Sequence, residues 1–166
     1  IAQNKLNIKF HSIVFPRNEI SKEYFPILKK LGFTHYRGNP NNFLYNKGHN
    51  KKNILIRAIR YLDSFIEIVK NYNTENCDSS ELINVQANRM LRPHNKIKIL
   101  NFLMIRRIKK EMLYAAKNNL NYHLWWHPHN FGLNTERNIQ NLENILSYYN
   151  YLKIEYGMNN CKISEI

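Results

Sequence analysis

Apolar residues along this chain alternate between short runs typical of strands and longer stripes at helical spacing. The short runs predict strands over residues 6–15, 33–37, 82–91, 122–126 and 161–166. The stripes predict helices over residues 21–30, 54–72, 97–117 and 136–156. Strand and helix therefore follow each other in turn.

Residues that break or cap secondary structure bound these predicted elements. Ser21 and Thr135 are suited to cap helix N-termini, and Pro26 is expected to delay or kink the first helix. Gly32 and Gly157 are suited to end the first and last helices, because glycine adopts positive φ at little cost. Strands are expected to stop at the prolines that follow them.

Alternation of strands with helices of this length implies parallel βαβ units. With 166 residues, the chain is predicted to be a single α/β domain spanning residues 1–166. A closed parallel barrel needs more strands than this pattern supplies. The sequence therefore leaves two alternatives, an open sheet or a barrel whose other strands precede Ile1.

The formal net charge of +13 raises the question of a nucleic-acid partner. The basic residues are scattered, however, and Lys, Asn, Ile and Tyr are all encoded by A/T-rich codons. The densest cluster, residues 106–110, lies on a predicted helix and is interpreted as a solvated face. We therefore expect no nucleic-acid partner, although a basic nucleic-acid-binding domain stays an alternative.

Cysteine content and hydropathy indicate the compartment. Cys77 and Cys161 form neither a metal motif nor a disulfide framework, which is compatible with a reducing environment. No apolar stretch approaches the length of a membrane span, and no signal peptide is recognisable. We expect a cytoplasmic protein without a membrane span.

The run from Tyr122 to Gly132 holds three histidines and both tryptophans of the chain. Its polar residues, His127, His129 and Asn130, follow a predicted strand, at the end where parallel α/β folds keep their active sites. His127 is a candidate general acid, because imidazole exchanges protons near neutral pH. Two alternatives stay open: an ordinary strand end with a turn, and a zinc site formed by His127 and His129 with a third ligand elsewhere.

The two tryptophans are neighbours on a predicted strand, so Trp125 and Trp126 should point to opposite faces. At most one can line a site, and the other is expected in the core. Three further strand ends carry polar residues suited to substrate contact. These are Pro16, Arg17 and Asn18 after the first strand, Arg37 and Asn39 after the second, and Arg89 and Arg92 around the third. Each has an ordinary structural explanation, but together they predict one rim of polar side chains.

Four segments in this order resemble the polysaccharide deacetylases, the NodB-homology proteins of carbohydrate esterase family four. They are Ser12–Asn18, Tyr36–Pro40, Arg89–Pro93 and, most specifically, His123–Gly132. The likeness is to a branch found in bacterial surface-polysaccharide gene clusters. It implies a deformed (β/α) barrel that hydrolyses an N-acetyl group on a sugar. In that family a divalent ion such as zinc, held by an Asp and two His, activates water, and another Asp acts as base.

The resemblance also implies roles for individual residues. His127 matches the late histidine that protonates the leaving amine, and Arg17, beside Pro16, matches the arginine that orients the base. The family's Asp-Asp and His-x-x-x-His motifs precede the strand equivalent to residues 10–15. This chain is thus expected to cover only the C-terminal part of a deacetylase, to bind no metal and to be inactive alone. Tyr36–Asn39 also replaces the family's Asp- and Trp-containing motif, which leaves the orientation of Arg17 open.

The expected partner is an N-acetylated polysaccharide or oligosaccharide, contacted by a group of residues around the predicted rim. This substrate-binding set comprises Pro16, Asn18, Arg37, Asn39, Arg89, Arg92, Trp125, Trp126, His129 and Asn130. The oligomeric state stays open. The main alternative to an enzyme is a non-catalytic carbohydrate-binding or interaction module.

Overall fold

The computed structural model describes residues 7–40, 42–45, 54–70 and 82–166, without the side chain of Arg17. Their contacts divide the chain into two compact units. The first unit comprises Ile1–Asn39, Thr74–Gln86 and Asn160–Ile166, and the second comprises Pro40–Asn73 and Ala87–Asn159. A single domain over residues 1–166 stays a prediction.

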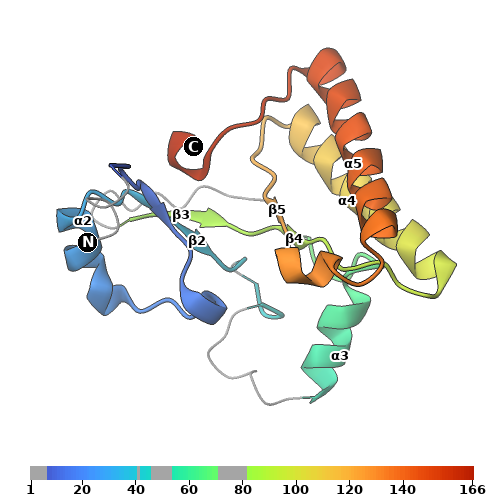
Figure 1. Ribbon diagram of the computed structural model, residues 1–166, viewed down its shortest axis with the longest axis horizontal. Helices are drawn as coiled ribbons and strands as arrows, with labels where there is room; N and C mark the ends of the chain where they lie inside the picture. Colours follow the sequence, from blue (N-terminus) through green and yellow to red (C-terminus); the bar gives the residue numbers. More distant parts are fainter. Residues whose placement is uncertain (1–6, 41, 46–53, 71–81) are drawn as a thin grey trace. The chain divides into compact units, whose positions relative to one another are not determined.

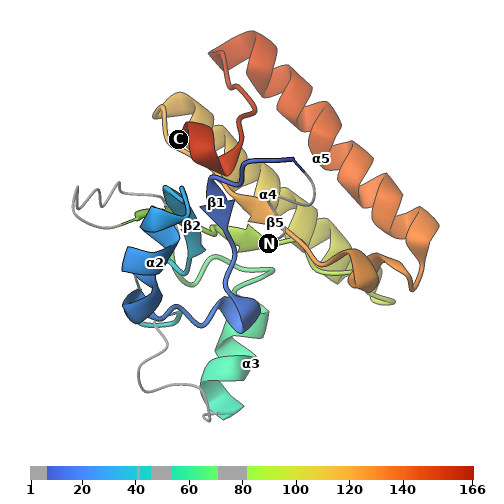
Figure 2. The ribbon, with the colours of Figure 1, turned by 60° about the vertical axis from the view of Figure 1, so that its left-hand side comes forward.

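The first unit is built on a three-stranded parallel sheet in the order β1-β2-β3. Its strands are β1 (Ser12–Ile13), β2 (His35–Gly38) and β3 (Ile83–Gln86). The 3₁₀ helices η1 (Pro16–Asn18) and η2 (Lys22–Tyr24) lead into helix α2 (Phe25–Lys30), which lies beside β1 and β2 in Figure 2. Aromatic and aliphatic side chains join helix and sheet in one small core: Phe15, Phe25, Leu28, Tyr36 and Leu82.

The second unit pairs two short parallel strands, β4 (Arg89–Met90) and β5 (Leu124–Trp125). Its helices are α3 (Ile54–Leu62), α4 (Lys98–Lys117) and α5 (Thr135–Tyr156), with η3 (Pro128–Phe131) between β5 and α5. Helices α4 and α5 lie side by side (Figure 1). The core lies mainly between them and includes Leu91, Met104, Ile108, Ile145 and Leu152.

Parallel strands alternating with helices confirm the predicted α/β class. The longest helices follow the sequence prediction closely, because α4 and α5 each carry a continuous apolar stripe. Gly32 and Gly157 both take positive φ, as expected of residues that end helices. None of the helices within the described ranges is long and apolar enough to cross a bilayer.

Some predicted boundaries are wrong. Residues 82–91, predicted to hold one short strand, hold two, β3 and β4, which belong to different sheets. The strand predicted at the C-terminus is instead the 3₁₀ helix η4 (Ile163–Glu165). There the Lys162 N–H donates to a Glu165 carboxylate oxygen at 2.8 Å, and this contact favours a turn. At the start of α5, Asn134 is the cap residue, and the Thr135 hydroxyl donates to the Phe131 carbonyl instead.

Helix α3 ends at Leu62, well before the predicted residue 72. Its end coincides with Asp63, which is fully buried. Oδ1 of Asp63 accepts hydrogen bonds from the N–H groups of Ile68 and Val69, both at 3.1 Å. The carboxylate thus takes up backbone donors that a longer helix would have used, and apolar residues such as Leu62 and Ile66 stay exposed.

Candidate functional site

The carboxyl ends of β4 and β5 coincide. The two strands pair in parallel, with Met90 opposite Trp125, and the Leu91 N–H donates to the Trp125 carbonyl at 2.8 Å. Arg92 and His127 each follow two residues after that last pair, so they lie at the same edge of the sheet. Two of the four predicted strand ends therefore meet within the second unit.

Aromatic rings surround His127 at this edge. The His127 ring makes an edge contact with Trp125, at 5.2 Å between centroids, and stacks on His129 at 5.1 Å. Residues i and i+2 of an extended chain share a face, which explains the Trp125 contact. Pro128 then begins η3, whose turn brings His129 back over His127. Both imidazoles are exposed, so this group is open to a ligand.

Neither tryptophan lies in the core, which corrects the expectation that one of them would. Trp125 is half-buried, and Trp126 is 37% exposed while stacking on the buried ring of Phe131 at 5.9 Å. Asn130 is half-buried in η3, where its N–H donates to the His127 carbonyl at 2.9 Å. The predicted residues of this run therefore gather around one exposed turn.

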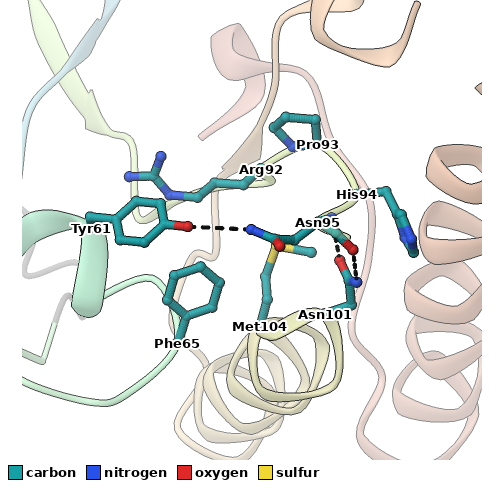
Figure 3. Close-up of a pocket in the computed structure, with 8 residues that line it drawn as sticks. All are labelled: Tyr61, Phe65, Arg92, Pro93, His94, Asn95, Asn101 and Met104. Carbon is teal, nitrogen blue, oxygen red and sulfur yellow. Dashed lines mark hydrogen bonds between the residues drawn. The ribbon is translucent and has the colours of Figure 1, made fainter. Parts of the chain in front are cut away.

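A shallow pocket of about 150 Å³ lies at the end of β4 (Figure 3). Residues of α3, the turn after it, the end of β4 and the start of α4 line it: Tyr61, Phe65, Arg92, Pro93, His94, Asn95, Asn101 and Met104. The Arg92 guanidinium carbon lies 4.9 Å from the centre of the Tyr61 ring, and the Asn95 amide donates to the Tyr61 hydroxyl at 3.3 Å. Arg92 is thus a predicted substrate residue that lines a cavity.

Arg89, which was predicted to contact substrate, is buried, with 3% of its surface exposed. Its guanidinium donates to both carboxylate oxygens of Glu111 and, at 2.9 Å, to Asp63. Arg107 donates to the same two carboxylates at 3.1 and 3.3 Å. These four residues, Asp63, Arg89, Arg107 and Glu111, are called the ion cluster below. Arg107 also shows that residues 106–110 are not wholly a solvated face.

Two tyrosines complete the ion cluster. The Tyr45 hydroxyl donates to Asp63 at 2.8 Å, and the Tyr122 hydroxyl donates to Glu111 at 3.0 Å. Burial, together with the Asp63 carboxylate, raises the pKa of Tyr45 to about 12. Burial and Glu111 likewise raise the pKa of Tyr122. Burial lowers the pKa of Arg89, but the bonds to Glu111 and Asp63 outweigh it and raise that pKa overall.

The first unit holds the other two predicted strand ends. Asn18, in η1, donates from its side-chain amide to the side-chain oxygen of Asn39, so these two ends also meet. Pro16 is exposed, and Arg37 is a half-buried residue of β2 whose pKa burial lowers. The Arg17 side chain lies outside the described part. A single rim formed by all four strand ends stays a prediction.

Sequence reasoning missed the residues that support Arg92. Tyr61 and Ser64 were predicted to belong to one continuous helix, and nothing in an apolar stripe indicates that a buried acid ends it. A weak signal was present, because Asp63 interrupts the apolar face predicted for residues 54–72. A buried carboxylate needs partners, and this requirement could have indicated a pairing with arginines elsewhere.

Within the described ranges, no group of three or more His, Cys, Asp or Glu side chains could hold a metal ion. His127 and His129 therefore have no third ligand there. Comparison of the chain with protein-family models, with curated proteins and with solved structures gives no match. Functional assignment accordingly rests on the motifs and on the geometry of the site.

Proposed function

We propose that this chain supplies the proton-donating and sugar-contacting residues of a sugar N-deacetylase of the polysaccharide deacetylase type. Its parallel strands and helices would then form part of the deformed (β/α) barrel of that family. The substrate is an N-acetylated sugar in a surface polysaccharide or its precursor. The motif order along the chain supports this assignment.

One observation carries the proposal: the exposed imidazole of His127 lies at the carboxyl edge of β5, in contact with the rings of Trp125 and His129. A general acid must reach the substrate, and an exposed position at a strand end allows it. Ring contacts on both sides restrict the orientation of the imidazole. The flat indole surfaces of Trp125 and Trp126 are suited to pack against the apolar face of a sugar ring.

Hydrolysis of the acetamide joins the water oxygen to the carbonyl carbon and breaks the C–N bond. Acetate and a free amine are the products, and the amine nitrogen gains a proton. Because an unprotonated amide nitrogen is a poor leaving group, the acid that protonates it determines whether the C–N bond breaks. His127 donates that proton from its ring nitrogen. Activation of the water is assigned to no described residue.

The experiment measures acetate release from an N-acetylglucosamine oligosaccharide by the protein expressed from its complete reading frame. His127→Ala is expected to lower kcat by roughly 10²-fold or more, the usual contribution of a general acid. Oligosaccharide binding should persist. Tryptophan fluorescence is a suitable readout of that binding, because Trp125 contacts the His127 ring and Trp126 is the only other tryptophan of the chain.

His11→Ala is the matched control, because His11 is an exposed histidine of the first unit. Its substitution should leave both acetate release and fluorescence titration unchanged. Acetate release that is equally fast in the His127→Ala protein would refute the assigned role of His127.

The exposed ring of Trp126 favours a second candidate, a non-catalytic carbohydrate-binding module. Exposed aromatic rings bind sugars without any chemical step. This candidate predicts a saturable fluorescence change with the oligosaccharide and no acetate release from the complete protein. It also predicts that Trp126→Ala weakens binding more than His127→Ala does.

A further inference from the structure

Arg92 differs from Arg89 and Arg107 because no carboxylate pairs with it among the described residues. Arg89 and Arg107 each contact both Asp63 and Glu111. Arg92 is half-buried at the pocket, and its one hydrogen bond within the described part runs from Nε to the Ser64 hydroxyl at 2.6 Å. A partly desolvated cation without a counter-ion is costly, and a bound anion offsets that cost.

The surroundings hold Arg92 in one orientation. Its guanidinium lies over the Tyr61 ring, and that ring makes an edge contact with Phe65 at 5.0 Å (Figure 3). Ser64 donates its own hydroxyl proton to the Arg60 carbonyl at 3.3 Å, so its oxygen is oriented to accept from Arg92. No hydrogen bond among the described residues engages the two terminal nitrogens of the guanidinium, which can therefore bind a ligand. A preorganised guanidinium loses less conformational entropy when it binds an anion.

We propose that Arg92 binds the oxygen atoms of a carboxylate or phosphate group carried by the sugar, so that the substrate is an acidic N-acetylated saccharide. This inference rests on the proposed function for the identity of the sugar, but not for the anion site itself. The shared chemistry is two oxyanion oxygens that accept two parallel N–H donors, a geometry that arginine matches well.

The pocket fits such a group in size and in polarity. A volume of about 150 Å³ accommodates one charged substituent rather than a whole oligosaccharide. Asn95 is held on one side by its bond to Tyr61, and its backbone N–H and carbonyl both contact the Asn101 side chain. Burial lowers the pKa of Arg92, in keeping with the desolvation that an anion would relieve. Arg92 shares its sheet edge with His127, so one saccharide could contact both residues.

The test is calorimetric titration of the complete protein with D-glucuronate, D-glucose 1-phosphate and D-glucose. At least one acidic sugar should bind roughly ten- to a hundredfold more tightly than glucose, the range expected for charge-assisted hydrogen bonds. A preference for glucuronate identifies a carboxylate ligand, and a preference for the phosphate ester identifies a phosphorylated sugar. Equal binding of all three sugars would overturn the proposal.

Single substitutions test whether Arg92 is the residue that binds the acidic group. Arg92→Ala should abolish the preference for the acidic sugar, and Arg92→Lys should retain only part of it, because lysine lacks the planar fork. Arg106→Ala, which removes an exposed arginine of α4, is the matched control and should bind like the parent protein. Ser64→Ala keeps the charge but frees Nε, so it should weaken acidic binding while glucose binding stays constant. An undiminished acidic preference in a folded Arg92→Lys or Arg92→Ala protein contradicts the assignment.

The titration and the acetate assay test separate proposals, so either proposal can be refuted while the other stands. Tight glucuronate binding without acetate release from any oligosaccharide would refute only the deacetylase proposal. Acetate release that depends on His127, with equal affinity for acidic and neutral sugars, would refute only the anion site.

Discussion

At the scale of single residues, the phenol of Tyr45 makes the ion cluster observable by absorbance spectroscopy. Its hydroxyl donates to Asp63, and its pKa is raised from 10.0 to about 12. The unfolded chain releases this proton near the ordinary pKa, whereas the folded chain keeps it. The stability that Tyr45 contributes is therefore complete below pH 10 and is lost as pH rises towards about 12.

We expect the near-ultraviolet absorbance of phenolate to show a late phase in an alkaline titration of the folded protein. Tyr45→Phe should remove part of that phase, and Tyr122→Phe another part, because both hydroxyls contact buried carboxylates. Tyr24→Phe, at an exposed tyrosine, is the matched control. Tyr148 and Tyr151 also have raised pKa values, so part of the late phase should survive both cluster substitutions. A late phase that neither cluster substitution diminishes would contradict the assignment.

Arg89 and Arg92 show what a sequence can and cannot reveal about single residues. The sequence placed both beside a strand end, and the structure has both there. It could not tell them apart, because their environments depend on Asp63 and Glu111, which lie 26 and 22 residues from Arg89. By contrast, the run around His127 is local, and its exposed turn after Pro128 was predictable from proline alone.

At the scale of elements, helix α5 ends at Gly157. Gly157 has φ of 69°, and a Cβ at this position would meet no atom within 4 Å. The backbone conformation alone therefore determines how much a side chain at Gly157 would destabilise the protein. Gly157→Ala should lower the free energy of unfolding by about 1–2 kcal/mol, as expected for a non-glycine residue forced into the left-handed region.

Gly132 supplies the matched control for this element. It has φ of −61° and ψ of −31°, which any residue adopts, and a Cβ there would lie 3.4 Å from the His129 carbonyl. Gly132→Ala should change stability little or slightly increase it. Urea unfolding of both variants distinguishes the two cases, and equal destabilisation would show that conformation is not the cause.

Element boundaries were predictable where the chain's own periodicity sets them. Helix α4 begins at Lys98, one residue from the expected start, and both predicted terminal glycines have positive φ. Helix α3 and the strand over residues 82–91 were misjudged for a common reason. In both cases, contacts to distant residues, the Asp63 carboxylate in one and strand pairing in the other, decide where the element stops.

At the scale of the whole molecule, the ion cluster contributes nothing to the net charge of +13. Two arginines and two carboxylates cancel there, so the excess positive charge lies elsewhere in the chain. Replacing one member leaves a buried charge without its partner. Asp63→Asn should therefore destabilise the protein by about 3–5 kcal/mol, measured by urea unfolding at neutral pH.

Glu67→Gln is the control for that substitution. Glu67 pairs with Lys110 at 2.6 Å, but the Lys110 side chain is largely exposed, so loss of the pair should cost at most about 1 kcal/mol. Comparable losses in both variants would indicate that the ion cluster is no more important than a surface pair.

The ion cluster also constrains how the second unit reaches its native state. Its charged groups come from segments around residues 63, 89 and 107–111, with tyrosines from residues 45 and 122. Any partly assembled form that dehydrates some of these groups before the others arrive must bear an unpaired charge. Such forms are therefore sparsely populated. We expect the amide protons of β4 and α4 to exchange with solvent through one concerted opening, with the same protection factor in both elements.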